Sequence, residues 1–157
     1  RALPLPLFAG SGRRYPVLRY PWENAKTALQ SLADNQPDLE CIQVAYVNPE
    51  TGEDAENILG FYALMLRPGQ ILNLPARSPA VVYHVIEGTA SATTKAQSFD
   101  LLPADTCCIP GYTPTMLKNR STTEPTFIFM ADESPLHRKL GVYEVRQSAQ
   151  PNMPAQI

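Results

Sequence analysis

Short apolar segments alternate with turn residues along most of this chain. The segments AVVYHVI and TFIFMA are typical of them, and turns containing Gly, Pro or Asp, such as RPGQ, separate one segment from the next. Period-two alternation in runs of this length predicts β-strands. About eight such strands at even spacing predict a closed sandwich or barrel of antiparallel sheets.

Two segments carry helical patterns instead. Residues Trp22–Ala33 predict a helix whose apolar face, at a spacing of three and four residues, contains Ala25, Ala28, Leu29, Leu32 and Ala33. The sequence ESPLHRKLG predicts a second, short helix, with Ser134 near its N-cap and Gly141 just past its end.

Neither end of the chain shows the residue spacing of a strand or of a helix. Residues 1–20 mix proline, glycine and basic residues, and predict an arm or inter-domain linker. Because proline donates no ladder hydrogen bond, we expect this arm to cross an outer surface or a neighbouring chain and not to form a core strand. Residues 147–157 predict a loose tail, which leaves 21–146 as the folded domain. The first residue is Arg1 and not Met, so we expect the sequence to be a fragment of a longer protein.

Size and charge exclude several classes of partner. The 157 residues suit one domain, and the net charge of −2 without a long basic run predicts no nucleic-acid partner. No apolar stretch approaches the roughly 20 residues of a membrane span, so no membrane partner is expected. Cys107 and Cys108 are not expected to form a disulfide, since adjacent strand residues point to opposite faces. Cys41, Cys107 and Cys108 are predicted to be small buried hydrophobic residues in a reducing compartment, the cytoplasm.

Three motifs resemble the cupin superfamily. They are the hairpin YHVIEGTA, the segment FDLLPADTCCIPGYTPT, and the closing strand and helix TFIFMADESPLHRKLGVYEVR. Cupins are small double-sheet jelly rolls. The resemblance implies an all-β cupin double-stranded β-helix (jelly roll) with an N-terminal arm and one or two short helices.

A narrower resemblance covers roughly residues 15–146. The segments LRYPWENAKTALQSL, QVAYVNPETGE and FMADESPLHRKLGVYEVR are similar to the C-terminal half of gentisate 1,2-dioxygenases and their salicylate and 1-hydroxy-2-naphthoate relatives. Those enzymes are bicupins that open an aromatic ring with non-haem Fe(II) and O₂. The resemblance implies that the partners of this chain are an N-terminal cupin of the same protein, a homo-oligomer, or both.

The same resemblance implies where iron ligands would stand. The iron-binding cupin of the family has His-x-His before the hairpin and a third His after the proline of the second motif. Counting along this chain places those positions at Pro75, Arg77 and Thr115. Proline has no side-chain donor, arginine stays protonated, and a lone hydroxyl is a poor Fe(II) ligand. We therefore expect no catalytic residue and no cofactor here, with Fe(II) only in a separate N-terminal cupin, and a structural or oligomerisation role for this chain.

Both histidines are assigned structural roles. If residue 77 faces the lumen between the sheets, alternation also directs Val81, Tyr83 and Val85 inward and His84 outward. His137 is predicted to lie on a solvated face of the short C-terminal helix. The aromatic residues, Phe127 and Phe129 among them, are predicted to belong to the core between the sheets.

The sequence leaves three alternatives open for the Arg77 side chain. A guanidinium in the lumen needs a partner, and a local carboxylate such as Asp105 is one candidate. A second is a small aromatic acid, bound by Arg77 with help from Tyr83, Tyr112 and Thr115. In a third, Arg77 points to solvent. The alternatives to a structural role are thus a small-molecule binding cupin without catalysis, and an unusual enzyme that uses Cys107 or Cys108.

Overall fold

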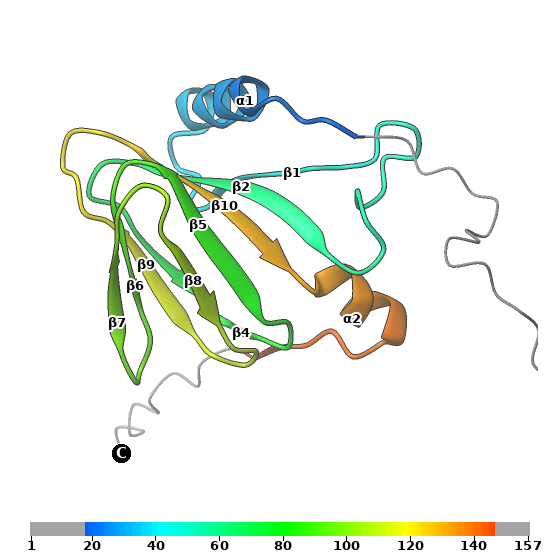
Figure 1. Ribbon diagram of the computed structural model, residues 1–157. Helices are drawn as coiled ribbons and strands as arrows, with labels where there is room; N and C mark the ends of the chain where they lie inside the picture. The colour runs from blue at the N-terminus through cyan, green and yellow to red at the C-terminus, as the bar shows by residue number, and fades with distance from the viewer. Residues whose placement is uncertain (1–17, 147–157) are drawn as a thin grey trace, which may run out of the picture.

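The computed structural model describes residues 18–146, and these form an antiparallel all-β domain with two helices (Figure 1). The fold class predicted from the sequence is therefore confirmed. The elements, in chain order, are α1 (Trp22–Asn35), β1 (Ile42–Ala45), β2 (Gly60–Leu66), β3 (Ile71–Leu74), β4 (Ala76–Arg77), β5 (Val81–Glu87), β6 (Ala90–Thr93), β7 (Ser98–Leu101), β8 (Thr106–Ile109), β9 (Thr115–Asn119), β10 (Thr126–Asp132), α2 (Ser134–Leu140) and β11 (Val145–Arg146).

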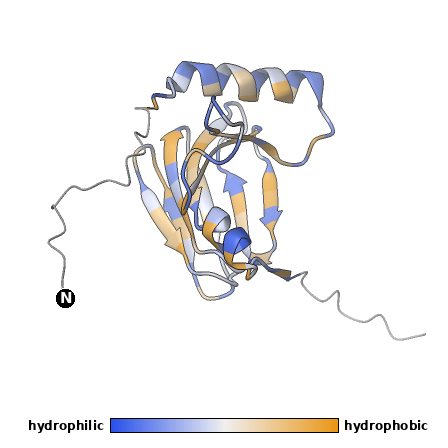
Figure 2. Ribbon diagram, turned by 90° about the vertical axis from the view of Figure 1, so that its right-hand side faces the viewer, coloured by the Kyte–Doolittle hydropathy of each residue, from blue (hydrophilic) through white to orange (hydrophobic). Residues whose placement is uncertain are grey.

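Two larger sheets enclose the main core. One has the strand order β1-β2-β10-β5-β8 and the other β3-β9-β6-β7, while β11 and β4 form a separate two-stranded ladder. Alternate residues of both sheets point into the space between them. Leu64, Val85 and Ile128 come from the five-stranded sheet, and Ala92 and Leu117 from the four-stranded one. Figure 2 shows the resulting alternation of hydrophobic and hydrophilic residues along the strands.

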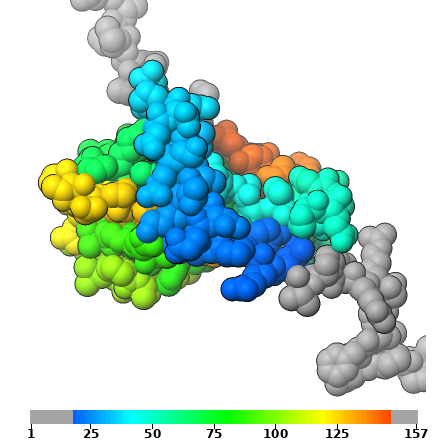
Figure 3. Space-filling view, turned by 90° about the horizontal axis from the view of Figure 1, so that it is seen from above, coloured from blue at the N-terminus to red at the C-terminus, as the bar shows by residue number. Residues whose placement is uncertain are grey.

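Helix α1 packs across the outer face of the five-stranded sheet (Figure 3). Ala25 and Leu29 are buried there in a second apolar cluster, which also contains Ile42, Met65 and Phe127. Ala28 was predicted on the same helix face but is exposed. The contact therefore rests on a narrower apolar stripe than the sequence pattern indicated.

A carboxylate on β5 fixes the start of α1. Glu87 accepts one hydrogen bond from Trp22 Nε1 at 2.8 Å and another from Lys26 Nζ at 2.6 Å. The hydrogen bond from Lys26, and then that from Trp22, hold the pKa of Glu87 below its ordinary value. These charge-assisted contacts connect the helix to the strand that borders the candidate site.

The structure corrects several local predictions. Strands β3, β4 and β11 were missed, because each is short and lies next to proline or turn residues. Ser134 lies next to the N-cap of α2, as predicted: Glu133 is the N-cap, Ser134 is the first helical residue, and its backbone N–H donates to Asp132 Oδ1 at 2.9 Å. Gly141 ends α2 as predicted, in the left-handed conformation with φ of 71°.

Most of the predicted arm, residues 1–17, and the predicted tail, 147–157, lie outside the described residues. Of the arm, only Leu18–Tyr20 is described. Tyr20 lies on the outer surface, where its hydroxyl donates to Val47 O at 2.7 Å. Across residues 18–146, neither helix combines the length and the apolar character that crossing a bilayer requires.

Candidate functional site

The three residues at the predicted iron-ligand positions meet at one end of the lumen. Pro75 joins β3 to β4, Arg77 ends β4, and Thr115 begins β9, where it pairs with Leu74 of β3. With Tyr83 and several apolar neighbours they line a cavity of only about 10 Å³. A space of that size accommodates a single water molecule at most, and no aromatic ring.

An ion pair closes this end of the lumen. Arg77 Nη1 lies 3.1 Å from Asp132 Oδ2, and the Asp132 side chain is completely inaccessible to solvent. Burial lowers the pKa of Arg77, but the Asp132 carboxylate and the Tyr143 hydroxyl outweigh it, and the net pKa is raised. The prediction that a carboxylate neutralises Arg77 is thus correct, whereas the partner named from the sequence was wrong.

Asp105, the predicted partner, has another role. Its Oδ2 accepts a hydrogen bond from Leu102 N at 2.8 Å and so closes its own turn before β8. Asp132 reaches Arg77 because β10 pairs with β5, in a register that sets Asp132 opposite Val81. That neighbourhood depends on strand pairing across about fifty residues, which local sequence does not reveal.

Of the four predicted ligand-binding residues, the structure brings three together. Arg77, Tyr83 and Thr115 line the small cavity, and Tyr83 is almost fully buried. Burial raises the pKa of the Tyr83 hydroxyl far above its ordinary value. This hydroxyl therefore stays protonated at neutral pH and adds no negative charge beside Arg77.

Tyr112 stands apart from the other three. It is 43% exposed, its hydroxyl donates to Glu144 Oε2 at 3.1 Å, and the Arg146 guanidinium lies 4.2 Å from its ring centre. The hydrogen bond to Glu144 raises the pKa of Tyr112. Its side chain is engaged at the surface with the segment that follows α2.

The residues at this end of the lumen do not fit an Fe(II) centre. Pro75 offers no donor atom, Thr115 offers a neutral hydroxyl, and Arg77 places a fixed positive charge where a cation would have to stand. Across residues 18–146, no three His, Cys, Asp or Glu side chains gather in a way that could hold a metal ion.

His84 faces away from the lumen, as predicted. Its neighbour Tyr83 belongs to the core between the sheets, whereas His84 lies on the outer face of β5 and its Nδ1 is 2.8 Å from Thr106 Oγ1. The prediction for His137 was wrong. Its Nδ1 lies 2.9 Å from Ser78 Oγ, so this half-buried ring joins α2 to the loop before β5 and does not form a solvated helix face.

The cysteines have the arrangement expected of adjacent strand residues. Cys107 is buried in the core as predicted, whereas Cys108 is exposed and Cys41 only partly buried, so the prediction of buried cysteines was wrong for Cys108; all three are free. Burial raises the pKa of the Cys41 and Cys107 thiols. A nucleophilic cysteine needs a lowered thiol pKa, so the environment of Cys107 disfavours the enzymatic alternative that used it.

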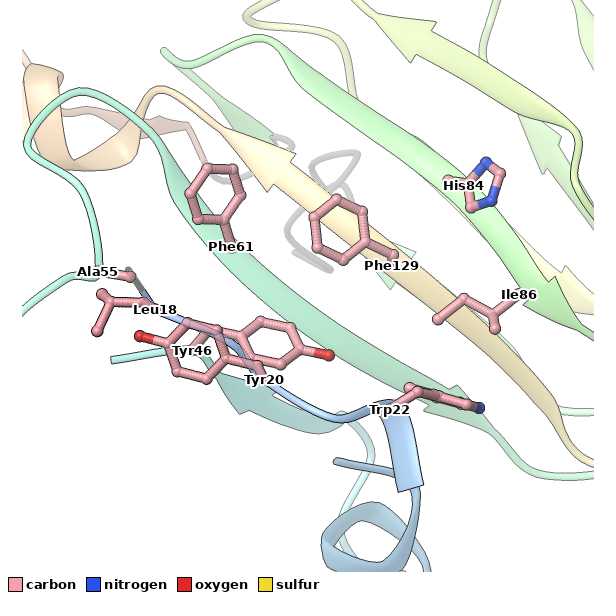
Figure 4. A pocket seen from close by; sticks show the side chains of 9 residues that line it. All are labelled: Leu18, Tyr20, Trp22, Tyr46, Ala55, Phe61, His84, Ile86 and Phe129. Atoms are coloured by element: carbon pink, nitrogen blue, oxygen red, sulfur yellow. The ribbon is translucent and has the colours of Figure 1, made fainter. Parts of the chain in front are cut away.

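The described residues also form a larger hollow, on the outer face of the five-stranded sheet (Figure 4). We call it the aromatic groove; its volume is about 590 Å³ and it is lined by Leu18, Tyr20, Trp22, Tyr46, Ala55, Phe61, His84, Ile86 and Phe129. Phe61 and Phe129 stack with ring centres 6.1 Å apart, and Tyr46 lies 6.2 Å from Phe129. The sequence patterns did not indicate this groove.

The groove corrects the prediction for the phenylalanines of β10. Phe127 and Phe129 do share one face, but it is the outer face: Phe127 is buried beneath α1 and Phe129 lines the groove. Ile128 and Met130 occupy the space between the sheets instead. Alternation groups residues by face, but it does not tell which face meets the second sheet.

The chain is similar to parts of aromatic-ring dioxygenases. It is 65% identical over 144 residues to a gentisate 1,2-dioxygenase of Ralstonia sp., a match that covers 92% of this chain and 41% of that protein. It is 26% identical over 140 residues to a 5-aminosalicylate 1,2-dioxygenase of Comamonas sp., covering 87% of this chain and 37% of that protein. The chain therefore spans about two fifths of the length of these curated relatives. No protein-family model matches it.

Solved structures agree on the fold. A salicylate 1,2-dioxygenase from Pseudoaminobacter salicylatoxidans, in a structure of its adducts with gentisate, superposes with a TM-score of 0.73 at 22% identity, over 83% of this chain and 37% of that one. The cupin domain of Cnp3 from Schizosaccharomyces pombe superposes with a TM-score of 0.52 at 11% identity, over 67% of this chain and 74% of that one. The predicted cupin fold and the resemblance to gentisate 1,2-dioxygenase are both confirmed.

Proposed function

We propose that this cupin domain is the metal-free C-terminal cupin of a longer, gentisate 1,2-dioxygenase-like protein, and that its role is structural. In this proposal it packs against an iron-bearing N-terminal cupin of the same protein, against other subunits, or against both. The observation that carries the proposal is the Arg77–Asp132 ion pair, which occupies the end of the lumen where the resemblance would place iron ligands.

The chemistry of ring opening supports catalysis in another domain of the longer protein and a structural role for this one. The enzymes that the chain resembles open the ring with non-haem Fe(II), which needs protein ligands and open coordination positions. Pro75, Arg77 and Thr115 provide no such centre, and the enclosed cavity that all three line, of about 10 Å³, has no space for a substrate. Catalysis would then depend on the other part of the longer protein.

The sequence similarity to a gentisate 1,2-dioxygenase and the exposed apolar residues from α2 to β11 both support a role in packing against another domain or subunit. The chain is 65% identical to about two fifths of a gentisate 1,2-dioxygenase, as expected of one domain that packs against the rest of such a protein. The segment from α2 to β11 exposes Leu140, Val142 and Val145 close together in sequence. Neighbouring apolar residues on a surface are typical of a contact with another domain or subunit.

The alternative function is a small-molecule binding cupin without catalysis. It is favoured by the convergence of Arg77, Tyr83 and Thr115, because a guanidinium beside a buried ring is suited to an aromatic carboxylate. Asp132 already neutralises Arg77, however, so an incoming carboxylate would have to displace a buried one. The proposed structural role therefore predicts that the lumen binds neither gentisate nor salicylate.

Isothermal titration calorimetry separates the two functions. We expect no binding heat when gentisate or salicylate is titrated into the chain up to about millimolar concentration, the range of weak specific ligands. Saturable heat that is present in the wild-type chain and absent in Arg77→Ala would support the binding function and contradict the structural one. The matched control is Arg120→Ala, which removes a surface arginine that pairs with Asp100.

A further inference from the structure

The aromatic groove is an apolar surface for which the described residues provide no cover. Helix α1 covers Phe127 on the same sheet face, but Phe61, His84 and Phe129 lie beyond it and line the groove (Figure 4). The volume of this concave groove, about 590 Å³, lies within the range of volumes found for ligand-binding sites. A contiguous patch of this kind marks a site that another chain segment or molecule occupies.

We propose that the groove binds residues 3–8 of the same chain, the sequence LPLPLF. The segment has four apolar side chains, Leu3, Leu5, Leu7 and Phe8, and two prolines between them. Proline-rich segments favour the extended polyproline II conformation and bind to grooves lined by aromatic rings, because little conformational entropy is lost. Tyr20, Trp22, Tyr46, Phe61 and Phe129 provide five such rings.

The position of the chain at the groove favours its own segment over a foreign one. Leu18 and Tyr20 already line the groove, so residues 1–17 continue directly from its border. The nine residues 9–17 between the two parts can span up to about 30 Å when extended, and Gly10 and Gly12 allow the chain to reverse. A tether of this length provides a local concentration in the millimolar range, which favours binding within one chain over capture of a separate molecule.

Charge complementarity supports the same arrangement. A neighbouring hollow shares Leu18 and Ala55 with the groove and is also lined by the exposed Glu53 and Glu56. The segment between LPLPLF and Leu18 contains Arg13 and Arg14. A chain that returns over the groove from Leu18 would bring these two arginines close to the two carboxylates. The inference does not depend on whether the lumen binds a metal or a ligand.

Trp22 allows a direct test, since it lines the groove and is the single tryptophan of the sequence. In the full chain, Leu5→Asp/Leu7→Asp is expected to shift Trp22 emission to the red and to raise its acrylamide quenching constant about twofold, because the docked segment no longer excludes the quencher. The control Ala2→Asp/Ala9→Asp adds the same charges outside LPLPLF and should leave Trp22 as in the wild type.

The groove itself provides the reciprocal variant. Phe129→Ser should raise the quenching of Trp22 to the same extent, and its combination with Leu5→Asp/Leu7→Asp should cause no further rise, because both remove one contact. The arm variants alone keep the test decisive if Phe129→Ser does not fold.

Unchanged quenching in Leu5→Asp/Leu7→Asp would overturn the proposal. So would protection that disappears as the protein is diluted to monomers, since the occupant would then be a second copy. Metal content and calorimetry would be unaffected in either case, so failure here is distinct from failure of the proposed function.

Discussion

Replacement of Arg77 by alanine is expected to lower the free energy of unfolding by about 3 kcal/mol, because it leaves the Asp132 carboxylate buried without a counter-charge. The Asp132 side chain is inaccessible to solvent and Arg77 is 21% exposed, so the lower end of the range for broken buried pairs applies. For a domain of this size the melting temperature should fall by about 6–12 °C. Thermal and urea unfolding of both proteins measure the effect.

Two further variants assign the loss to the ion pair. Arg120→Ala breaks the exposed Arg120–Asp100 pair and should change stability by less than about 1 kcal/mol. Arg77→Ala/Asp132→Asn removes both charges and keeps an oxygen for Ser134 N, so it should recover part of the loss. An Arg77→Ala variant as stable as Arg120→Ala would show that the pair does not close the lumen.

Replacement of Asn119 by alanine is expected to destabilise the domain by about 3–4 kcal/mol, near the upper limit of common single substitutions. Asn119 is fully buried at the end of β9. Its Nδ2 lies 2.8 Å from Glu124 O, 3.0 Å from Arg67 O and 3.2 Å from Leu66 O. Its Oδ1 accepts from Ser121 N and from Thr126 Oγ1, both at 2.9 Å. Alanine would remove all of these hydrogen bonds, including the two buried ones, to Leu66 O and from Thr126 Oγ1.

Asn73→Ala is the matched control, because Asn73 is exposed on the neighbouring strand β3. We expect it to change the free energy of unfolding by no more than about 0.5 kcal/mol. Similar urea midpoints for the two alanine variants would mean that Asn119 does not connect β2, β9 and β10 as the hydrogen bonds indicate.

The sequence alone was sufficient for the features that depend on local periodicity. Alternation placed Tyr83 inside and His84 outside, and the turn residues delimited most of the strands. Gly141 marked the end of α2. Such features depend on neighbours within a few residues, so they are present in the sequence pattern itself.

Features that depend on pairing between distant strands were not predictable in the same way. Asp105 was the candidate partner named for Arg77 from the sequence, and only the β5–β10 register shows that Asp132 lies beside it instead. Phe129 was correctly grouped with Phe127 on one face of β10, but that face was wrongly assigned to the space between the sheets. Alternation groups residues by face and does not tell against which face the second sheet packs. The aromatic groove is formed by residues of α1, β2, β5 and β10, by Leu18 and Tyr20 that precede α1, and by Tyr46 and Ala55 between β1 and β2, so no single segment carried its signal.

The proposal with the widest consequences is that this cupin domain holds no metal ion. It is tested most directly by elemental analysis of the untagged chain after anaerobic incubation with Fe(II) and dialysis against a chelator. We expect Fe, Mn, Ni and Zn to remain far below one atom per chain, because Pro75, Arg77 and Thr115 offer no ligand set. Retention of one atom of any of these metals per chain would contradict the account.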